Sequence, residues 1–199
     1  IIAVTKSVST KEIEELLALD IDNIGENRVQ ELIKKYTEIN KRAKWHMIGH
    51  LQTNKVRQII DKVALIHSLD RWSLAKELSK RAGRINRKIP VLIQVNIAKE
   101  ESKFGLFQEE VIPFIKKVAD LPYIAIKGLM TMAPLAEDPE EIRYVFRDLK
   151  TLSQKIKEMN FEGVEMKYLS MGMTNDYEVA VEEGANLVRI GSGIFGKRT

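Results

Sequence analysis

Short apolar segments alternate with longer amphipathic segments along the whole chain. The short segments are rich in Ile, Val and Leu and have the length of β-strands, whereas the longer ones repeat their apolar residues at helical spacing. This alternation is typical of βα units built around a parallel sheet. It predicts eight strands, over residues 1–5, 22–25, 45–49, 63–68, 90–96, 125–130, 167–171 and 187–191.

Seven helices are predicted between these strands. The first begins behind Ser9 or Thr10 as the N-cap, the fifth opens with Glu109 and Glu110, and the sixth has Pro139 in its first turn. They extend over residues 10–19, 28–40, 54–61, 71–83, 108–121, 139–159 and 175–184. After the eighth strand, residues 194–199 are too few for a covering helix, so we expect one flank of the sheet to be bare.

The βα alternation predicts an α/β fold, specifically a (β/α)8 TIM barrel. With 199 residues and 44% hydrophobic content, the chain can bury one sizeable core, and barrels of about this size form one domain. No linker, low-complexity stretch or further repeat interrupts the pattern. We therefore expect residues 1–199 to form a single barrel domain.

Composition narrows the class of protein. There is no cysteine, which excludes disulfides, thiolate zinc sites and cysteine nucleophiles. The net charge of +4 is a small surplus of 32 basic over 28 acidic residues, so we expect no nucleic-acid binding. No apolar run approaches the roughly 18 residues of a membrane span, and no signal segment precedes the first strand. We expect a soluble, cytoplasmic protein that does not bind membranes.

Residues from the two ends of the chain are expected to meet at one mouth of the barrel. Lys6 ends the first strand and Arg189 lies on the eighth, and closure makes these strands neighbours. The loops at residues 170–174 and 191–193 combine glycines with hydroxyl residues. Loops after strands seven and eight often bind phosphate in this fold, through backbone N–H groups and a helix N-terminus. Together these parts suit a small aldehyde that carries a phosphate.

Lys6 is the candidate reactive group at this mouth. Strand alternation places Ile2, Val4 and Lys6 on one face. A lysine amine that is partly desolvated beside a second cation loses its proton more easily and can form a Schiff base with an aldehyde. Each feature can also be explained by a structural role alone. Lys6 would then be a solvated lysine at a strand end, Gly-Ser-Gly a simple turn, and Arg189 an ion-pair partner. Their joint placement on strands one, seven and eight favours the functional interpretation.

At these residues the chain resembles the pyridoxal phosphate homeostasis proteins, a family of single-domain barrels similar to the N-terminal domain of bacterial alanine racemases. The matching segments are Ala-Val-Thr-Lys at 3–6, Gly-Glu-Asn-Arg-Val-Gln-Glu at 25–31, Trp-His-Met-Ile-Gly-His-Leu-Gln-Thr-Asn-Lys at 45–55, Ser-Lys-Phe-Gly at 102–105, Gly-Leu-Met at 128–130, Leu-Ser-Met-Gly-Met-Thr at 169–174 and Val-Arg-Ile-Gly at 188–191. They span the whole chain in order. The family normally begins with a helix before the strand that carries the lysine, and we expect this chain, which starts at Ile1, to lack it.

The resemblance implies a cofactor and a set of site residues. Lys6 carries pyridoxal 5′-phosphate (PLP) as an internal aldimine, Arg189 faces the pyridine nitrogen, and Asn27 lies beside the ring. The residues that hold the phosphate, partly through backbone N–H groups, are then Ser170, Gly172, Met173, Gly191 and Ser192.

The expected function is to carry or buffer PLP, with little or no catalysis. PLP withdraws electrons best when its ring nitrogen is protonated, and an arginine opposite that nitrogen disfavours the proton. Racemisation also needs a second acid or base, which alanine racemases take from a tyrosine positioned by another domain and subunit. The expected partners are PLP itself and PLP-requiring apoenzymes, and we expect a monomer.

Three other functions would also use features of this chain. A PLP-dependent amino-acid racemase would use the same site, and a Schiff-base aldolase would use an interior strand lysine, for which Lys127 is the candidate. A barrel that binds a phosphorylated sugar would form no covalent bond at all. His46 and His50 lie four residues apart on a strand and its loop, without a carboxylate at metal-ligand spacing, so we interpret them as core or rim residues and expect no metal site.

Overall fold

The computed structural model describes residues 1–39 and 42–196. Within these residues, eight parallel strands form one sheet. Each predicted strand is present. The strands are β1 (Ile2–Val4), β2 (Asn23–Glu26), β3 (Lys44–Met47), β4 (Val63–Leu69), β5 (Ile89–Gln94), β6 (Ile124–Met130), β7 (Val164–Ser170) and β8 (Arg189–Ile190).

The connections between the strands are largely helical. They comprise α1 (Thr10–Ala18), α2 (Val29–Ile39), the 3-10 helix η2 (Thr53–Lys55), α3 (Val56–Ile59), α4 (Trp72–Arg84), α5 (Gln108–Ala119), the 3-10 helix η3 (Pro139–Ile142), α6 (Arg143–Glu158), α7 (Tyr177–Glu182) and α8 (Ser192–Phe195). Ser9 caps α1 through a reciprocal pair of hydrogen bonds with Glu12. In the part of the chain that the structure describes, no helix is both long and apolar enough to cross a membrane.

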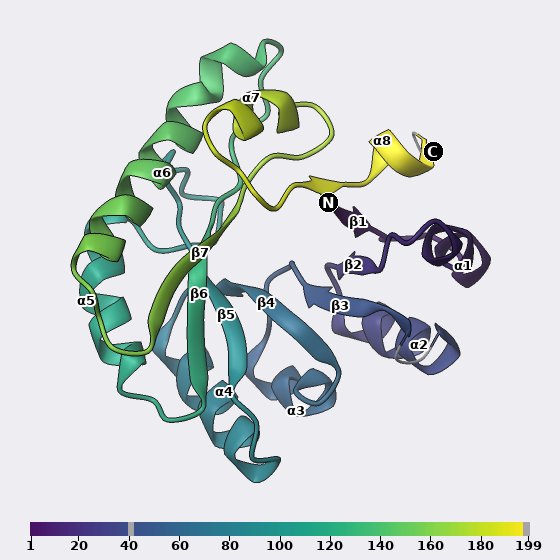
Figure 1. Cartoon of the computed structure of the whole chain (residues 1–199), viewed down its shortest axis with the longest axis horizontal. Coiled ribbons are helices and arrows are strands. Elements are labelled where there is room, and N and C mark those ends of the chain that lie inside the picture. Colours follow the sequence, from purple (N-terminus) through teal and green to yellow (C-terminus); the bar gives the residue numbers. More distant parts are fainter. Residues whose placement is uncertain (40–41, 197–199) are drawn as a thin grey trace.

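The sheet curls until its edge strands meet. The strand order is β7-β6-β5-β4-β3-β2-β1-β8, and Ile2 on β1 lies opposite Arg189 on β8. Between β7 and the residues that lead into β8, a bridge joins Ser170 to Leu187, and the Arg189 N–H group donates to the Gly172 carbonyl over 3.0 Å. Figure 1 shows the strands around a common centre with the helices outside. The predicted barrel is confirmed, and β1, β7 and β8 lie on the same side of it.

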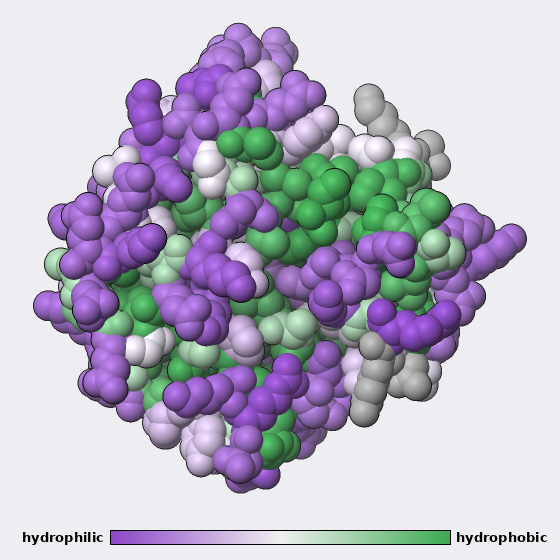
Figure 2. Space-filling view, viewed as in Figure 1, coloured by the Kyte–Doolittle hydropathy of each residue, from purple (hydrophilic) through white to green (hydrophobic). Residues whose placement is uncertain are grey.

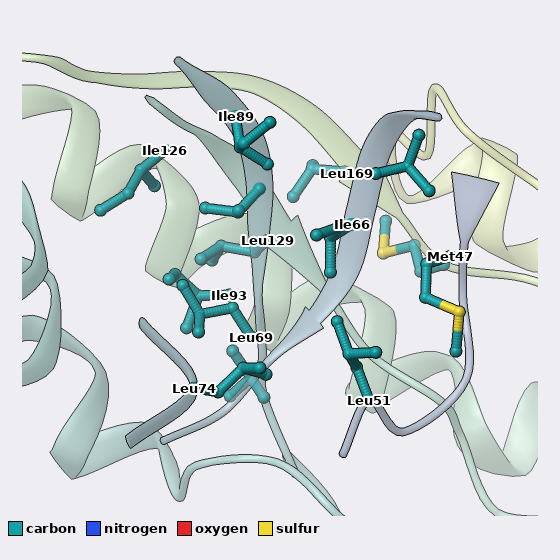
Figure 3. Packing of buried hydrophobic residues seen from close by; sticks show 14 of the residues in the cluster. Met47, Leu51, Ile66, Leu69, Leu74, Ile89, Ile93, Ile126, Leu129 and Leu169 are labelled. Carbon is teal, nitrogen blue, oxygen red and sulfur yellow. The ribbon is translucent and has the colours of Figure 1, made fainter. Parts of the chain in front are cut away.

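Apolar side chains pack on both faces of the curled sheet, in a large cluster on the outer face and a small one on the inner face. The larger cluster lies between the strands and the helices, where Figure 3 shows Leu69 of β4, Leu74 of α4 and Ile93 of β5 packed together. A smaller cluster inside the barrel contains Leu65 and Leu92. Burying one such side chain contributes about 1.5–3 kcal/mol. Because both faces are covered, several strands are nearly continuous apolar runs rather than alternating ones.

Several element boundaries differ from the predicted ones. β7 begins at Val164, three residues before the predicted start at Lys167, because the exposed charges of Glu165 and Lys167 obscure the beginning of the strand in the sequence. The predicted third helix is split into η2 and α3. Where we expected no covering helix after the last strand, the chain forms the helical turn α8. The predicted end of the second helix at Asn40 lies outside the described residues.

Candidate cofactor-binding site

A cavity of about 480 Å³ opens at the C-terminal ends of the strands. Val4 from the end of β1, Asn27 after β2 and Arg189 on β8 line its wall, together with residues from the loops after β5, β6 and β7. This is the end at which TIM barrels bind their ligands, and the volume is in the usual range for a small-molecule site. The structure therefore places the cavity where the sequence predicted the site.

The turn after β8 and the loop after β7 meet at one hydroxyl group. Thr174 Oγ1 accepts hydrogen bonds from the backbone N–H groups of Gly191 (3.4 Å) and Gly193 (3.2 Å). Thr174, Gly191 and Ser192 all line the cavity. The Thr174 hydroxyl therefore joins the loop after β7 to the turn after β8 at the cavity wall. Thr174 was not among the predicted binding residues, although its hydroxyl closes the Leu-Ser-Met-Gly-Met-Thr segment.

The loop after β7 is longer than predicted. Met173 and Asp176 form a turn in which the Asp176 carboxylate accepts the Met173 N–H over 2.5 Å. This turn uses Asp176 and delays α7 to Tyr177, two residues later than the predicted start at Asn175. Consequently Thr174 and Asn175 lie on the cavity wall rather than in the first turn of a helix.

Lys6 lies beside the Gly191–Ser192 turn. It follows β1 in a turn closed by the Val8 N–H donating to the Thr5 carbonyl, and its side chain is exposed. Lys6 lines a smaller cavity of about 190 Å³, which shares Val4, Gly191 and Ser192 with the larger one. The two cavities therefore adjoin along the Gly191–Ser192 turn, with the Lys6 amine on one side and Arg189 on the other.

Arg189 is a buried cation on the wall of the larger cavity. Its Nη1 donates to Ser170 Oγ over 2.7 Å and its Nη2 donates to the Thr131 carbonyl over 2.9 Å. Burial lowers the pKa of Arg189 to about 10, against the opposing charge of Asp176. At neutral pH the guanidinium therefore remains protonated and presents a fixed positive charge to the cavity.

Two of the predicted phosphate-binding residues lie behind the cavity wall. Ser170 is fully buried, does not line the cavity, and uses its hydroxyl for Arg189 and for His67 Nδ1 at 2.9 Å. Gly172 is also buried, and a Cβ there would lie 2.7 Å from that of Ala180. Its φ of +89° falls in the region that favours glycine, so it allows the chain to turn tightly between β7 and the cavity loop.

Asn27 and Met173, two further predicted residues, do line the cavity. Asn27 is held by a close backbone approach, because a Cβ on Gly49 would lie 2.3 Å from the Asn27 carbonyl oxygen. Of the eight predicted residues, five line the larger cavity: Asn27, Met173, Arg189, Gly191 and Ser192.

A buried charged network supports the strand end next to Lys6. Lys35 Nζ donates to Glu26 Oε1 over 2.7 Å and to the Thr5 carbonyl over 2.5 Å, and the Thr5 hydroxyl donates to the same Glu26 oxygen over 2.5 Å. Burial raises the pKa of Glu26, while Lys35 and Thr5 lower it. Sequence reasoning missed this network, since Lys35 sits in a helix pattern with no sign that its side chain is buried.

Lys127, His46 and His50, which were considered for other kinds of chemistry, line neither of these two cavities. Lys127 pairs with Glu165 and lines a separate cavity of about 240 Å³ at the N-terminal ends of the strands, away from the Gly191–Ser192 turn. His46 is buried inside the barrel, and His50 stacks on Phe104 at 3.8 Å between ring centres. Both histidines thus occupy the core and rim positions predicted for them.

Comparison with known proteins identifies the family. The family model for the alanine racemase N-terminal domain matches residues 1–199. The pyridoxal phosphate homeostasis protein of Aquifex aeolicus is 44% identical over 200 residues, covering 100% of this chain and 86% of the relative. That of Helicobacter pylori strain 26695 is 37% identical, covering 98% of this chain and 86% of the relative.

Solved structures give the same result. PipY of Synechococcus elongatus without PLP has a TM-score of 0.92 at 34% identity, and PipY with PLP bound has 0.89 at 33% identity. Each comparison covers 98% of this chain and 91% of PipY. The alanine racemase of Corynebacterium glutamicum shares the fold at a TM-score of 0.76 and 18% identity, with 99% of this chain matching 56% of the racemase. This chain belongs to the pyridoxal phosphate homeostasis protein family, built on the barrel of the alanine racemase N-terminal domain.

Proposed function

We propose that this protein binds pyridoxal 5′-phosphate at the C-terminal mouth of the barrel, through a Schiff base at Lys6, and carries or buffers the cofactor with little or no catalysis. Its relatives are named pyridoxal phosphate homeostasis proteins, and PipY has been solved with PLP bound. Both names come from proteins that match nearly the whole chain at more than 30% identity.

The observation that carries the proposal is the gathering of three chemically distinct groups around two adjoining cavities. Lys6 contributes a primary amine, Arg189 a buried cation, and the Gly191–Ser192 turn with the Thr174 hydroxyl a polar wall for a phosphate. An aldehyde that carries a phosphate needs these functions within one small site. The donor set therefore fits PLP.

Each residue has a separate task in holding the cofactor. The exposed Lys6 amine is accessible to an incoming aldehyde, and the turn with Thr174 binds a phosphate. Arg189 keeps its charge and repels a proton from a ring nitrogen placed against it. When bound, the cofactor supplies a reactive aldehyde and an electron-withdrawing ring. Arg189 weakens that withdrawal, and this favours storage over chemistry.

The lining of the cavity also supports weak catalysis. Among the described residues that line it, the ionisable ones are Lys103, Asp176 and Arg189. Lys103 donates to the Ala133 carbonyl over 3.1 Å and pairs with Glu100, while Asp176 is engaged in its turn. The second acid or base that racemisation requires is not provided by these side chains as they are held.

Release to an apoenzyme requires contact at the cavity rim. Leu135, with 91% of its surface exposed, and the partly exposed Met173 place apolar side chains there. On the face shown in Figure 2 most of the surface is hydrophilic, but apolar side chains gather where β8 and α8 lie in Figure 1. Exposed apolar groups beside a cofactor site suit a transient partner surface.

Titration of the purified protein with PLP tests the binding site. The visible absorption band of the amine–aldehyde linkage should grow to saturation in the wild type and in Lys11→Ala, whose lysine is exposed on α1 outside both cavities. Lys6→Ala should form no saturable band. A band of wild-type size in Lys6→Ala that disappears in Lys127→Ala would contradict the assignment.

Transfer tests the carrier role. PLP-loaded protein, freed of excess cofactor, should restore activity to a PLP-requiring apoenzyme and should leave the configuration of L-alanine unchanged over hours. Racemisation at an enzyme-like rate that Lys6→Ala abolishes would contradict the proposal and favour the racemase alternative.

A further inference from the structure

A row of hydrogen-bonded polar side chains runs through the interior of the barrel. It begins at the cofactor cavity and ends at the opposite mouth of the barrel, where Asn23 and His46 line the cavity of about 240 Å³ that also contains Lys127. We refer to it as the interior chain. Its members, in order, are Arg189, Ser170, His67, His46, Asn23 and Asp22.

Each neighbouring pair in the interior chain is within hydrogen-bond distance. The successive separations are 2.7 Å from Arg189 Nη1 to Ser170 Oγ, 2.9 Å on to His67 Nδ1, 3.0 Å from His67 Nε2 to His46 Nδ1, 3.1 Å from His46 Nε2 to Asn23 Oδ1, and 2.8 Å from Asn23 Nδ2 to Asp22 Oδ1. The members come from β8, β7, β4, β3, β2 and the residue that precedes β2, so the closed barrel brings them together.

The two ends of the interior chain require the same direction of donation. At one end Asp22 is a carboxylate that accepts the Asn23 amide N–H, so Asn23 Oδ1 accepts from His46 Nε2. A neutral imidazole has one N–H group, and in His46 this group is on Nε2. His46 Nδ1 therefore has no proton and accepts from His67 Nε2.

The same requirement holds from the other end. Arg189 can only donate, so the Ser170 oxygen accepts from it and the Ser170 hydroxyl donates to His67 Nδ1. Starting from either end therefore gives the same arrangement, in which both rings are neutral and carry their proton on Nε2.

The electrostatics of the interior agree with this arrangement. Burial lowers the pKa of His46 to about 4, and burial together with the nearby charge of Arg189 holds the pKa of His67 well below its usual range. Both rings are therefore neutral at neutral pH. In each hydrogen bond of the interior chain the donor lies on the side of Arg189 and the acceptor on the side of Asp22. Hydrogen bonds that are aligned in this way strengthen one another in a low dielectric. This arrangement favours the charged guanidinium.

We propose that the interior chain positions Arg189, fixing the orientation and charge of its guanidinium on the wall of the cofactor cavity. Ser170 and His67 are then positioning residues that affect the cofactor without lining its cavity, and Ser170 is not a phosphate ligand. The inference rests on the proposed function, because it takes PLP as the occupant of that cavity.

Nitrogen NMR of the histidine rings tests the interior chain directly. The protein has three histidines, so labelled imidazoles give few signals to assign. In cofactor-free protein at neutral pH, His46 and His67 should both be neutral and protonated on Nε2. His50 lies at the rim and serves as an internal reference. Rings protonated on Nδ1, or exchanging between both forms, would overturn the proposal.

Substitutions at Ser170 test the consequence for the cofactor. Ser170→Ala removes the link between Arg189 and His67, so it should shift the His67 and His46 signals and leave His50 unchanged. Ser170→Ala removes a hydrogen bond to the charged Arg189, and bonds of this kind stabilise more than neutral ones. The Kd for PLP should therefore rise about tenfold or more. Ser170→Thr keeps the hydroxyl and should stay close to wild type. Ser153→Ala, a matched buried serine on α6, is the control.

The outcomes separate this inference from the proposed function. If the wild type binds PLP but Ser170→Ala binds it within twofold of wild type, the positioning role is wrong and the proposed function stands. If Ser170→Thr binds PLP as weakly as Ser170→Ala, keeping the hydroxyl does not restore binding, and the proposal is overturned as well. If the wild type fails to bind PLP, the proposed function falls, and the role toward the cofactor falls with it.

Discussion

Replacing Lys35 by methionine tests how the structure stabilises the strand end that bears Lys6. Glu26 is fully buried and Lys35 is 6% exposed, so the variant removes one partner of a buried ion pair. Such a change costs about 3–5 kcal/mol, because the remaining charge is buried without compensation. The other carboxylate oxygen of Glu26 already has no hydrogen-bond partner among the described residues, which favours the upper part of that range. The Thr5 carbonyl also loses one of its two donors and keeps the Val8 N–H.

The loss of stability should depend on pH. Burial raises the pKa of Glu26 from its ordinary value of 4.5 despite the nearby Lys35, and without that cation the pKa rises further. A carboxyl with a raised pKa in the folded state stabilises it below pH 4.5 and loses that contribution as the pH rises through the folded value. Lys35→Met should therefore be much less stable than wild type at pH 7 and closer to it at pH 5.

Urea unfolding followed by circular dichroism at both pH values measures this difference. Lys34→Met, an exposed neighbour on the same helix, should stay within about 0.5 kcal/mol of wild type. Adding Glu26→Leu to Lys35→Met should recover most of the loss, because the unpaired charge is then gone. A cost below about 1 kcal/mol at pH 7, with the pH dependence of wild type, would refute this reasoning.

Three further changes follow from local geometry. Gly49→Ala should move Asn27, because its Cβ would lie 2.3 Å from the Asn27 oxygen, and both the melting temperature and the PLP affinity should fall relative to wild type. Thr174→Val removes the oxygen on which two N–H groups converge and should weaken PLP binding several-fold in an absorption titration, whereas Thr174→Ser should not. Ser9→Ala removes the cap of α1 and should cost about 1 kcal/mol in urea unfolding without altering PLP affinity; a changed affinity would argue against this purely structural role.

The sequence predicts the barrel well because its strands are short, apolar and regularly separated by helices. Turn residues limit where each strand can end, so the sequence predicts that the loops at 170–174 and 191–193 lie at the same mouth of the barrel. Residues of both loops line the cavity there. Arg189 and Gly191 could be placed at the site because the fold itself brings β8 beside β1. The beginning of β7 was missed because its exposed charges lower its apolar character.

Contacts between distant segments could not be predicted in this way. Ser170 was assigned to phosphate, but barrel closure places it against His67, 103 positions earlier in the chain, and below the cavity wall. The burial of Lys35 depends on how α2 packs over β1 and β2, which its helical pattern does not reveal. Likewise Lys6 leaves the strand for a turn, so strand alternation alone does not describe its direction.

Reductive trapping followed by peptide mapping tests the central claim most directly. Protein loaded with PLP is treated with borohydride, which makes an amine–aldehyde linkage permanent, and is then digested and analysed by mass spectrometry. The account predicts one stoichiometric cofactor label, on the peptide that contains Lys6, with the other lysines labelled only in trace amounts. A stoichiometric label on Lys127 or Lys103 with Lys6 unmodified, or no stoichiometric label at all, would contradict it.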